Sequence, residues 1–345
     1  MAHQITGTDN MITARKPAWH GMGTIIPENV TPHDALKLAH LDWEVREQLL
    51  YTIDDSGTET TRENVPTHKL LVRSDNNEQL SVVGSDYCVF QNNEVANFIN
   101  DVLAGDFSSV ETAGSLRGGR KVWFLLDQGQ HDVAGVDPIL KYALFTTSHD
   151  GSLAFRVLPT ETRVVCANTL SASGANDLNK GVSIRHKKNM RSSIDAARHA
   201  LTTLQTEHDI MLEKCEKLAS VEVDSEWLRS FFMRAYARTA STPPTPIRPQ
   251  MTDDQRRKAE KANERAQKIV TQWLVNFEDR DGGECHAKVA TSAWAAFNSV
   301  SRWADHARTV QGEAQDPTRR MESNLLGTSA KLKAEAFSTA LELAC

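Results

Sequence analysis

Hydrophobic and polar residues alternate along much of the first half of the chain, which is the spacing of side chains on the two faces of a β-strand. Residues 66–73 and 79–83 predict a hairpin around the turn-forming sequence Ser74-Asp-Asn-Asn77. Residues 41–45 predict another strand. The first hundred residues therefore contain antiparallel β-structure.

Two helices are expected among these strands. Thr31-Pro-His-Asp34 is typical of a helix start, with threonine as the N-cap and proline at the first helical position, and it predicts a helix to about residue 40. Residues 92–103 carry Val95, Phe98 and Ile99 at helical spacing, so a second helix is expected there.

Residues 109–167 predict an antiparallel meander with turns at Gly118-Gly119 and at His149-Asp-Gly151. An Asp-Gly pair between alternating runs is a strong hairpin signal, because it can supply the positive φ angles of a tight turn. The expected strands cover residues 110–116, 121–126, 140–147, 153–158 and 163–166.

Beyond residue 189 the hydrophobic period changes from two to about 3.6, and residues 194–218 predict a long helix with one apolar face. More helices are expected at residues 225–238, 252–277, 289–310 and 317–343. We therefore predict an α+β fold, in which an antiparallel β-meander packs with a long helix and a mostly α-helical C-terminal region follows. The expected division is a core domain at 1–220 and a helical region at 221–345, with a proline-rich linker at 241–250.

Composition narrows the class of protein. With 345 residues, 40% hydrophobic and 24% charged, the chain can bury a substantial core. Its net charge of -6 argues against coating of duplex DNA by overall positive charge, so any nucleic-acid surface must be local. Five cysteines without a CxxC pair disfavour a disulfide framework and a structural zinc site. The polar N-terminus and the lack of a long apolar run predict a cytoplasmic protein that does not enter a membrane.

One local segment is strongly basic. Residues 178–191 contain no acidic residue, and their cations are Lys180, Arg185, Lys187, Lys188 and Arg191. About five phosphate contacts to a single strand would give a log-log salt slope near -3.5. A solvated loop and helix start explains the same run equally well.

A second positive group lies on the predicted meander. Arg117, Arg120 and Lys121 flank its central hairpin, and Arg156 and Arg163 lie on neighbouring strands. Arg156 stands between Phe155 and Val157, so strand alternation turns its side chain to the opposite face. Solvated strand arginines are the simpler interpretation of each residue alone, and their clustering favours a nucleic-acid-binding face.

Candidates for catalysis are weaker. His149 and Asp150 are able to serve in acid-base chemistry, but Asp-Gly is ordinary turn chemistry and no HxH or HExxH pattern accompanies it. Cys166 follows two valines at the end of an expected strand, which favours a small buried residue over a nucleophile. Trp19, Trp43 and Trp123 are candidates for base stacking, although core packing is favoured for each. We therefore predict no catalytic residue, metal site or cofactor.

Several of these segments together resemble a family. They are Pro17-Ala-Trp-His-Gly-Met-Gly23, Leu41-Asp-Trp43, Gly118-Gly-Arg-Lys-Val-Trp-Phe124, Ser148-His-Asp-Gly-Ser152, Thr162-Arg-Val-Val-Cys-Ala-Asn-Thr-Leu170, Arg185-His186, Ala293-Trp-Ala-Ala-Phe-Asn298, Asp305-His306 and Lys331. The chain resembles the uncharacterised "phage/plasmid-like protein" family, a domain of unknown function in bacteria, phages and plasmids. The resemblance implies a mobile-element setting in a bacterial cytoplasm and supplies no reaction. The order of elements is also similar to the core of Rad-fifty-two-type single-strand annealing proteins, but the signature residues of those proteins are not found.

These observations favour single-stranded DNA binding or annealing in phage or plasmid recombination or replication, by a homo-oligomer without a cofactor. The alternative is a protein-binding accessory or structural factor of a mobile element, which an exposed apolar stripe on helix 194–218 would favour. A third hypothesis, a hydrolase or nuclease, requires His149, Asp150 and His186 to converge on one pocket.

Overall fold

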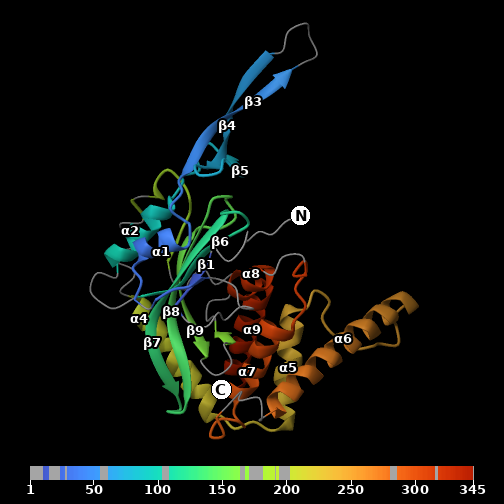
Figure 1. The fold of residues 1–345 in the computed structure, drawn as a ribbon. Coiled ribbons are helices and arrows are strands. Elements are labelled where there is room, and N and C mark those ends of the chain that lie inside the picture. Colours follow the sequence, from blue (N-terminus) through green and yellow to red (C-terminus); the bar gives the residue numbers. More distant parts are fainter. Residues whose placement is uncertain are drawn as a thin grey trace.

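The protein has an α+β fold, as predicted (Figure 1). A computed structural model describes residues 11–14, 24–27, 29–54, 61–102, 109–163, 168–170, 182–190, 192–193, 203–279, 286–314 and 318–344.

The larger sheet contains the predicted meander. Strands β6, β7, β8 and β9 are successive antiparallel neighbours in the order β10-β9-β8-β7-β6-β1-β2, and β11 also pairs with β9. The short strands were not predicted, because two or three residues carry no readable alternation. The bounds are β1 (Met11–Thr13), β2 (Thr24–Ile25), β6 (Val110–Leu116), β7 (Lys121–Val133), β8 (Asp137–Ser148), β9 (Phe155–Arg163), β10 (Asn168–Leu170) and β11 (Val182–Ile184).

Alternation along these strands divides the apolar side chains between two faces. Helices α1 (Pro32–Leu38) and α2 (Asn92–Val102) share one core with Phe124, Phe145 and Phe155. The opposite face carries a separate cluster that includes Trp123 and Leu144.

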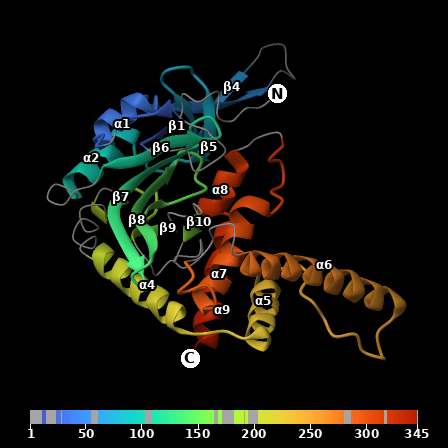
Figure 2. The ribbon, with the colours of Figure 1, turned by 60° about the horizontal axis from the view of Figure 1, so that its bottom comes forward.

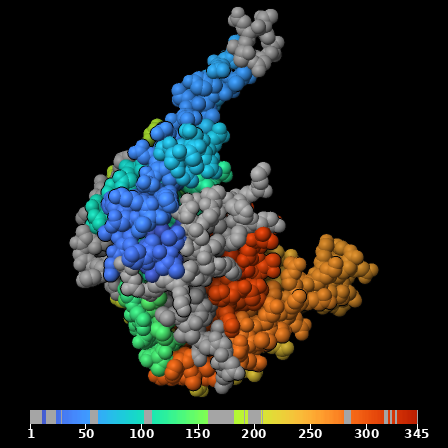
Figure 3. Space-filling model, viewed as in Figure 1, coloured from blue at the N-terminus to red at the C-terminus, as the bar shows by residue number. Residues whose placement is uncertain are grey.

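A second, three-stranded sheet has the order β3-β4-β5, with bounds β3 (Val45–Asp54), β4 (Thr61–Arg73) and β5 (Gln79–Gly84). Its β3–β4 hairpin projects from the body of the protein, and we call it the arm (Figures 1 and 3). The predicted β4–β5 hairpin is confirmed. The strand predicted at 41–45 is wrong apart from Val45, because Leu41 and Trp43 pack into the core and the strand begins only after them.

Helices form the second half, as predicted (Figure 2). They pack around a core that includes Phe232, Trp273 and Phe337. The predicted long helix begins at residue 203 in the described chain, and its earlier part lies outside the described residues. The bounds are α4 (Thr203–Ser220), α5 (Ser225–Thr239), α6 (Asp253–Glu278), α7 (Ala293–Arg302), a π-helix (Trp303–Ala307), α8 (Thr318–Leu326) and α9 (Thr328–Leu343).

Two helix predictions need correction. The helix expected from residue 289 starts at Ala293, because the Ser292 hydroxyl caps it by accepting a hydrogen bond from the Ala295 amide at 3.3 Å. The helix expected at 317–343 is two helices separated at Gly327, where a Cβ atom would lie 2.8 Å from the Ser323 Cα. None of the described helices is both long and apolar enough to span a bilayer.

Candidate nucleic-acid interface

Two predicted phosphate-binding residues on the meander are engaged within the chain. Arg117 Nη2 lies 2.9 Å from Glu322 Oε2, and Lys121 Nζ lies 2.5 Å from Glu322 Oε1. Burial alone would raise the pKa of Glu322, but these two cations hold it below its usual value. Arg117 and Lys121 thus join the β6–β7 hairpin to α8, and Glu322 neutralises one of their two positive charges.

The other predicted cations of the meander lie apart. Arg120 is exposed and donates to the Gln79 carbonyl at 3.5 Å. Arg156 is half-buried on β9, opposite Ser183 of β11. Arg163 is the last residue of β9, and its side chain lies outside the described part of the structure. Lys180 and Arg191 also lie outside the described residues.

A different set of cations gathers at the root of the arm. We call Lys69, Arg185, Lys187 and Lys188 the basic ridge. Lys188 Nζ lies 2.6 Å from Asp86 Oδ1, and both side chains are largely exposed. The hydrogen bond and charge of Lys188 lower the pKa of Asp86, with further contributions from Lys187 and Lys69. Segments far apart in the sequence therefore bring three lysines near one carboxylate, and Lys69 itself also pairs with Glu47, at 2.7 Å from Nζ to Oε1.

The segment that carries Arg185, Lys187 and Lys188 is held in place by hydrogen bonds and packing. Strand β11 pairs with β9, and the Cys88 amide donates to the His186 carbonyl at 3.2 Å. His186 Nδ1 lies 3.0 Å from the Cys88 carbonyl, and its ring stacks on Tyr87 with centroids 4.9 Å apart. Burial alternates along this segment, so His186 is buried while Arg185 and Lys187 are exposed. The side chains of Arg185 and Lys187 are thus exposed to solvent on a segment whose backbone is packed against the protein.

His149 lies in the protein interior. Its Nε2 is 2.9 Å from Asn92 Oδ1, while Asn92 Nδ2 donates to the Leu41 carbonyl. The Asn92 oxygen must therefore accept, which places the proton of the neutral imidazole on Nε2 and leaves a lone pair on Nδ1. Burial and the neighbouring His186 lower the pKa of His149 to about 3.

The interpretation of His149 and Asp150 as turn residues is correct for Asp150 and wrong for His149. Asp150 Oδ1 accepts a hydrogen bond from the Ser152 amide at 2.9 Å, as turn aspartates do. His149 instead belongs to the core, with 0% of its surface exposed. Among the described residues no group of three His, Cys, Asp or Glu could hold a metal ion. The structure therefore does not supply the open pocket that the hydrolase hypothesis requires at His149.

The segments that contain Gly118-Gly119 and His149 both contact Trp43. Arg73 lies 4.4 Å from the ring centroid of Trp43, and the ring of His149 contacts it edge-on at 5.5 Å. Gly119 has a φ of 95°, and a Cβ atom there would lie 2.7 Å from the Trp43 ring, so the turn needs glycine for this contact. Core packing of Trp43 is confirmed, as it is for Trp123. Trp19 and Cys166 lie outside the described residues.

Comparison with known proteins identifies a family but no activity. The family model described as a domain of unknown function (DUF932) matches residues 79–326. No curated protein and no solved structure matches the chain, so the similarity to annealing proteins gains no support from them. The matched region contains most of the basic ridge and much of the helical half, whereas the whole arm precedes it.

Proposed function

The chain belongs to the DUF932 family, and because that description names no activity, we propose from the site itself that the basic ridge binds single-stranded DNA. The observation that carries this proposal is the convergence of Lys69, Lys187 and Lys188 around Asp86. The phosphates of the strand would replace Asp86 as the partner of Lys188, and they would compete for Lys69 with Glu47, whose Oε1 lies 2.7 Å from Lys69 Nζ. Bound by its backbone, the strand keeps its bases free to pair, which suits annealing in phage or plasmid recombination or replication in a bacterial cytoplasm.

The small size of the ridge favours a single strand over a duplex. A flexible strand can follow a short row of cations from β4 to the segment after β11, whereas duplex DNA has a persistence length of about 150 base pairs and cannot bend so sharply at low cost. The net charge of -6 also repels a duplex that approaches any other broad surface.

Substitution of Lys187 and Lys188 by alanine should weaken binding of single-stranded DNA at least about tenfold and make the salt slope shallower by about 1.4, since two phosphate contacts are lost. Asp86→Asn should act in the opposite direction and tighten binding, because it frees Lys188. Fluorescence anisotropy with a labelled oligonucleotide measures both effects. The matched control is Lys261→Ala with Lys268→Ala, two exposed lysines of α6. Equal affinities of the two double variants would remove the proposed site.

Homo-oligomerisation is proposed through the arm. Leu49, Tyr51 and Ile53 occupy alternate positions of β3 and are between 53% and 65% exposed, with a register shift against β4 between Leu49 and Tyr51. Strand β3 is at the edge of its sheet. Antiparallel pairing with β3 of a second copy about Tyr51 places Leu49 opposite Ile53 of that copy and the two tyrosines together, so the apolar pattern is self-complementary.

Tyr51→Glu should therefore convert the oligomer to a monomer, because it places two like charges opposite each other across the pairing axis. Light scattering coupled to gel filtration reports the mass. Thr52→Glu, on the other face of the same strand, is the control. A monomeric unmodified protein, or equal dissociation by both variants, would contradict pairing through β3.

The alternative of a protein-binding accessory factor gains little from the described part of the long helix. Met211, Cys215 and Leu218 of α4 are buried, and they pack with Ile139 of β8 and with helices of the second half. The described part of the apolar stripe, from Met211 to Leu218, thus packs against the chain itself.

A further inference from the structure

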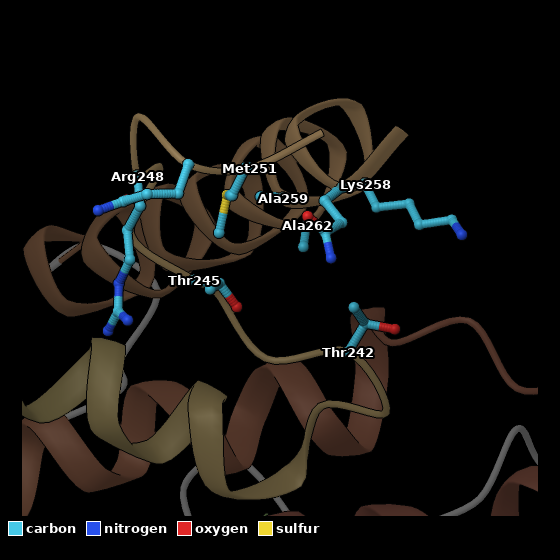
Figure 4. Close-up of a pocket in the computed structure, with 9 residues that line it drawn as sticks. Thr242, Thr245, Arg248, Met251, Lys258, Ala259 and Ala262 are labelled. Atoms are coloured by element: carbon cyan, nitrogen blue, oxygen red, sulfur yellow. The ribbon is translucent and has the colours of Figure 1, made fainter. Parts of the chain in front are cut away.

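A pocket of about 310 Å³ lies between α5, α6, the π-helix and the start of α9. Its lining includes the aromatic residues Tyr236, Trp273 and Trp303 and the cations Arg265 and Arg308. A larger pocket of about 530 Å³, between the proline-rich linker and α6, is also lined by Thr242 (Figure 4). In Figure 4, Thr242 and Thr245 of the linker lie across from Ala259 and Ala262 of α6.

The smaller pocket presents hydrogen-bond donors that lack acceptors. Arg308 Nη1 donates to the Thr328 carbonyl at 2.8 Å, but among the described residues Arg308 has no carboxylate partner, and burial lowers its pKa. Arg265 forms no hydrogen bond or ion pair with any described residue. Trp273 Nε1 is buried and likewise has no hydrogen-bond partner in the described structure. Among the residues that the structure describes, no Asp or Glu lines the pocket.

Unmatched donors of this kind point to an anionic ligand. A buried donor without an acceptor is costly, and a guanidinium without a carboxylate binds phosphate strongly and with defined geometry. Hydroxyl groups of Ser241 and Thr242 add further donors around the pocket, whereas the Thr239 hydroxyl already donates to the carbonyls of Ala235 and Tyr236.

The aromatic residues specify the rest of the ligand. The ring centroids of Trp273 and Trp303 are 5.7 Å apart with the rings edge-on at 75°, and those of Tyr236 and Trp273 are 6.4 Å apart at 59°, so the three rings form one contiguous aromatic cluster beside the pocket. Trp303 Nε1 already donates to Gln272 Oε1 at 2.7 Å, whereas Trp273 Nε1 still needs an acceptor. A nitrogen heterocycle offers both a flat apolar surface and an acceptor atom, which a hydrocarbon ring does not.

We propose that this pocket binds a nucleoside monophosphate, with the base against Tyr236, Trp273 and Trp303 and the phosphate held by Arg265 and Arg308. The volume lies at the lower end of the usual range for ligand sites, about 300–1,000 Å³, as a ligand of this size requires. The site shares no residue with the basic ridge, so it stands whether or not the ridge binds DNA.

The test is isothermal titration of the full-length protein with each common nucleoside 5′-monophosphate, with the matching nucleosides and with inorganic phosphate. At least one monophosphate should bind with a dissociation constant below about 1 mM, while its nucleoside and phosphate alone should bind at least about tenfold more weakly. Arg265→Gln should weaken the monophosphate about tenfold to a hundredfold, the loss expected for a hydrogen bond to a charged group.

Arg256→Gln is the matched control. Arg256 lies nine residues before Arg265 on α6 and therefore on the opposite face of the helix. Its substitution should leave the affinity for the monophosphate unchanged. Both arginines are exposed, so neither substitution threatens the fold. Trp273→Phe tests the proposed contact with the base, because it keeps an aromatic ring but removes the Nε1 hydrogen-bond donor. No binding of any monophosphate at millimolar concentration, equal binding of inorganic phosphate, or an unchanged affinity in Arg265→Gln would overturn the proposal.

Discussion

Replacement of Lys333 by alanine is expected to lower the free energy of unfolding by about 3–5 kcal/mol, which is the usual cost of leaving a buried charge without its partner. Lys333 Nζ lies 2.7 Å from Asp305 Oδ1, and the two side chains are 0% and 3% exposed. Asp305 belongs to the π-helix, where its backbone carbonyl accepts hydrogen bonds from Arg320 and Asn324. It therefore has little freedom to turn its carboxylate towards water.

Urea denaturation at neutral pH measures this loss. The control is Lys331→Ala, an exposed lysine two residues earlier on α9, which should change the stability by no more than about 0.5 kcal/mol. Removing both charges with Asp305→Asn and Lys333→Met should recover most of the stability, because no unpaired charge remains. A loss below about 1 kcal/mol in Lys333→Ala would show that the pair is not buried as described.

Acidification is expected to destabilise the protein steeply between about pH 6.5 and pH 3 through His149. Burial and the neighbouring His186 lower the pKa of this imidazole to about 3 in the folded protein, from an ordinary value of 6.5. Between these values the unfolded chain binds a proton that the folded chain does not, so stability falls as the pH falls. The loss approaches about 1.4 kcal/mol per pH unit, or about 3–5 kcal/mol over the whole window.

The measurement is the difference between the unfolding free energies at pH 7.5 and at about pH 5. It should be clearly smaller in His149→Gln than in the unmodified protein, whatever the stability of the variant at neutral pH. His68→Gln, a substitution of an exposed histidine on β4, should leave the difference unchanged. The same difference in His149→Gln and in the unmodified protein would mean that His149 titrates normally.

Local signals in the sequence predicted most of the fold. Thr31 caps α1 with proline at the first helical position, as expected, and Thr252 opens α6 with a complete capping box. The strands of the meander were found because their alternation is long enough to read. At residues 149–151 the Asp-Gly signal correctly predicted a hairpin, but the expected tight turn is wrong. The loop runs from residue 149 to 154, and within it only Gly151 has a positive φ.

The site was less predictable, because it depends on contacts between distant segments. Nothing near Lys69 in the sequence indicates that it lies beside Lys187 and Lys188. The pairing of Arg117 and Lys121 with Glu322 spans about two hundred residues, so their charge looked free. The burial of His149 was hidden for the same reason, since Trp43 and Asn92 reach it from other elements. By contrast, Arg185, Lys187 and Lys188 were readable as a local basic group, because their segment contains no acidic residue.

Binding of single-stranded DNA by the basic ridge is tested most directly by a fluorescence-anisotropy titration of the unmodified protein. Labelled single-stranded and duplex oligonucleotides are compared at two salt concentrations. With four phosphate contacts we predict a preference for the single strand and a log-log salt slope of about -2.8, or an affinity about 50-fold lower at about 200 mM than at about 50 mM salt. No binding of the single strand at the lower salt concentration, or equal binding of the duplex, would contradict the claim.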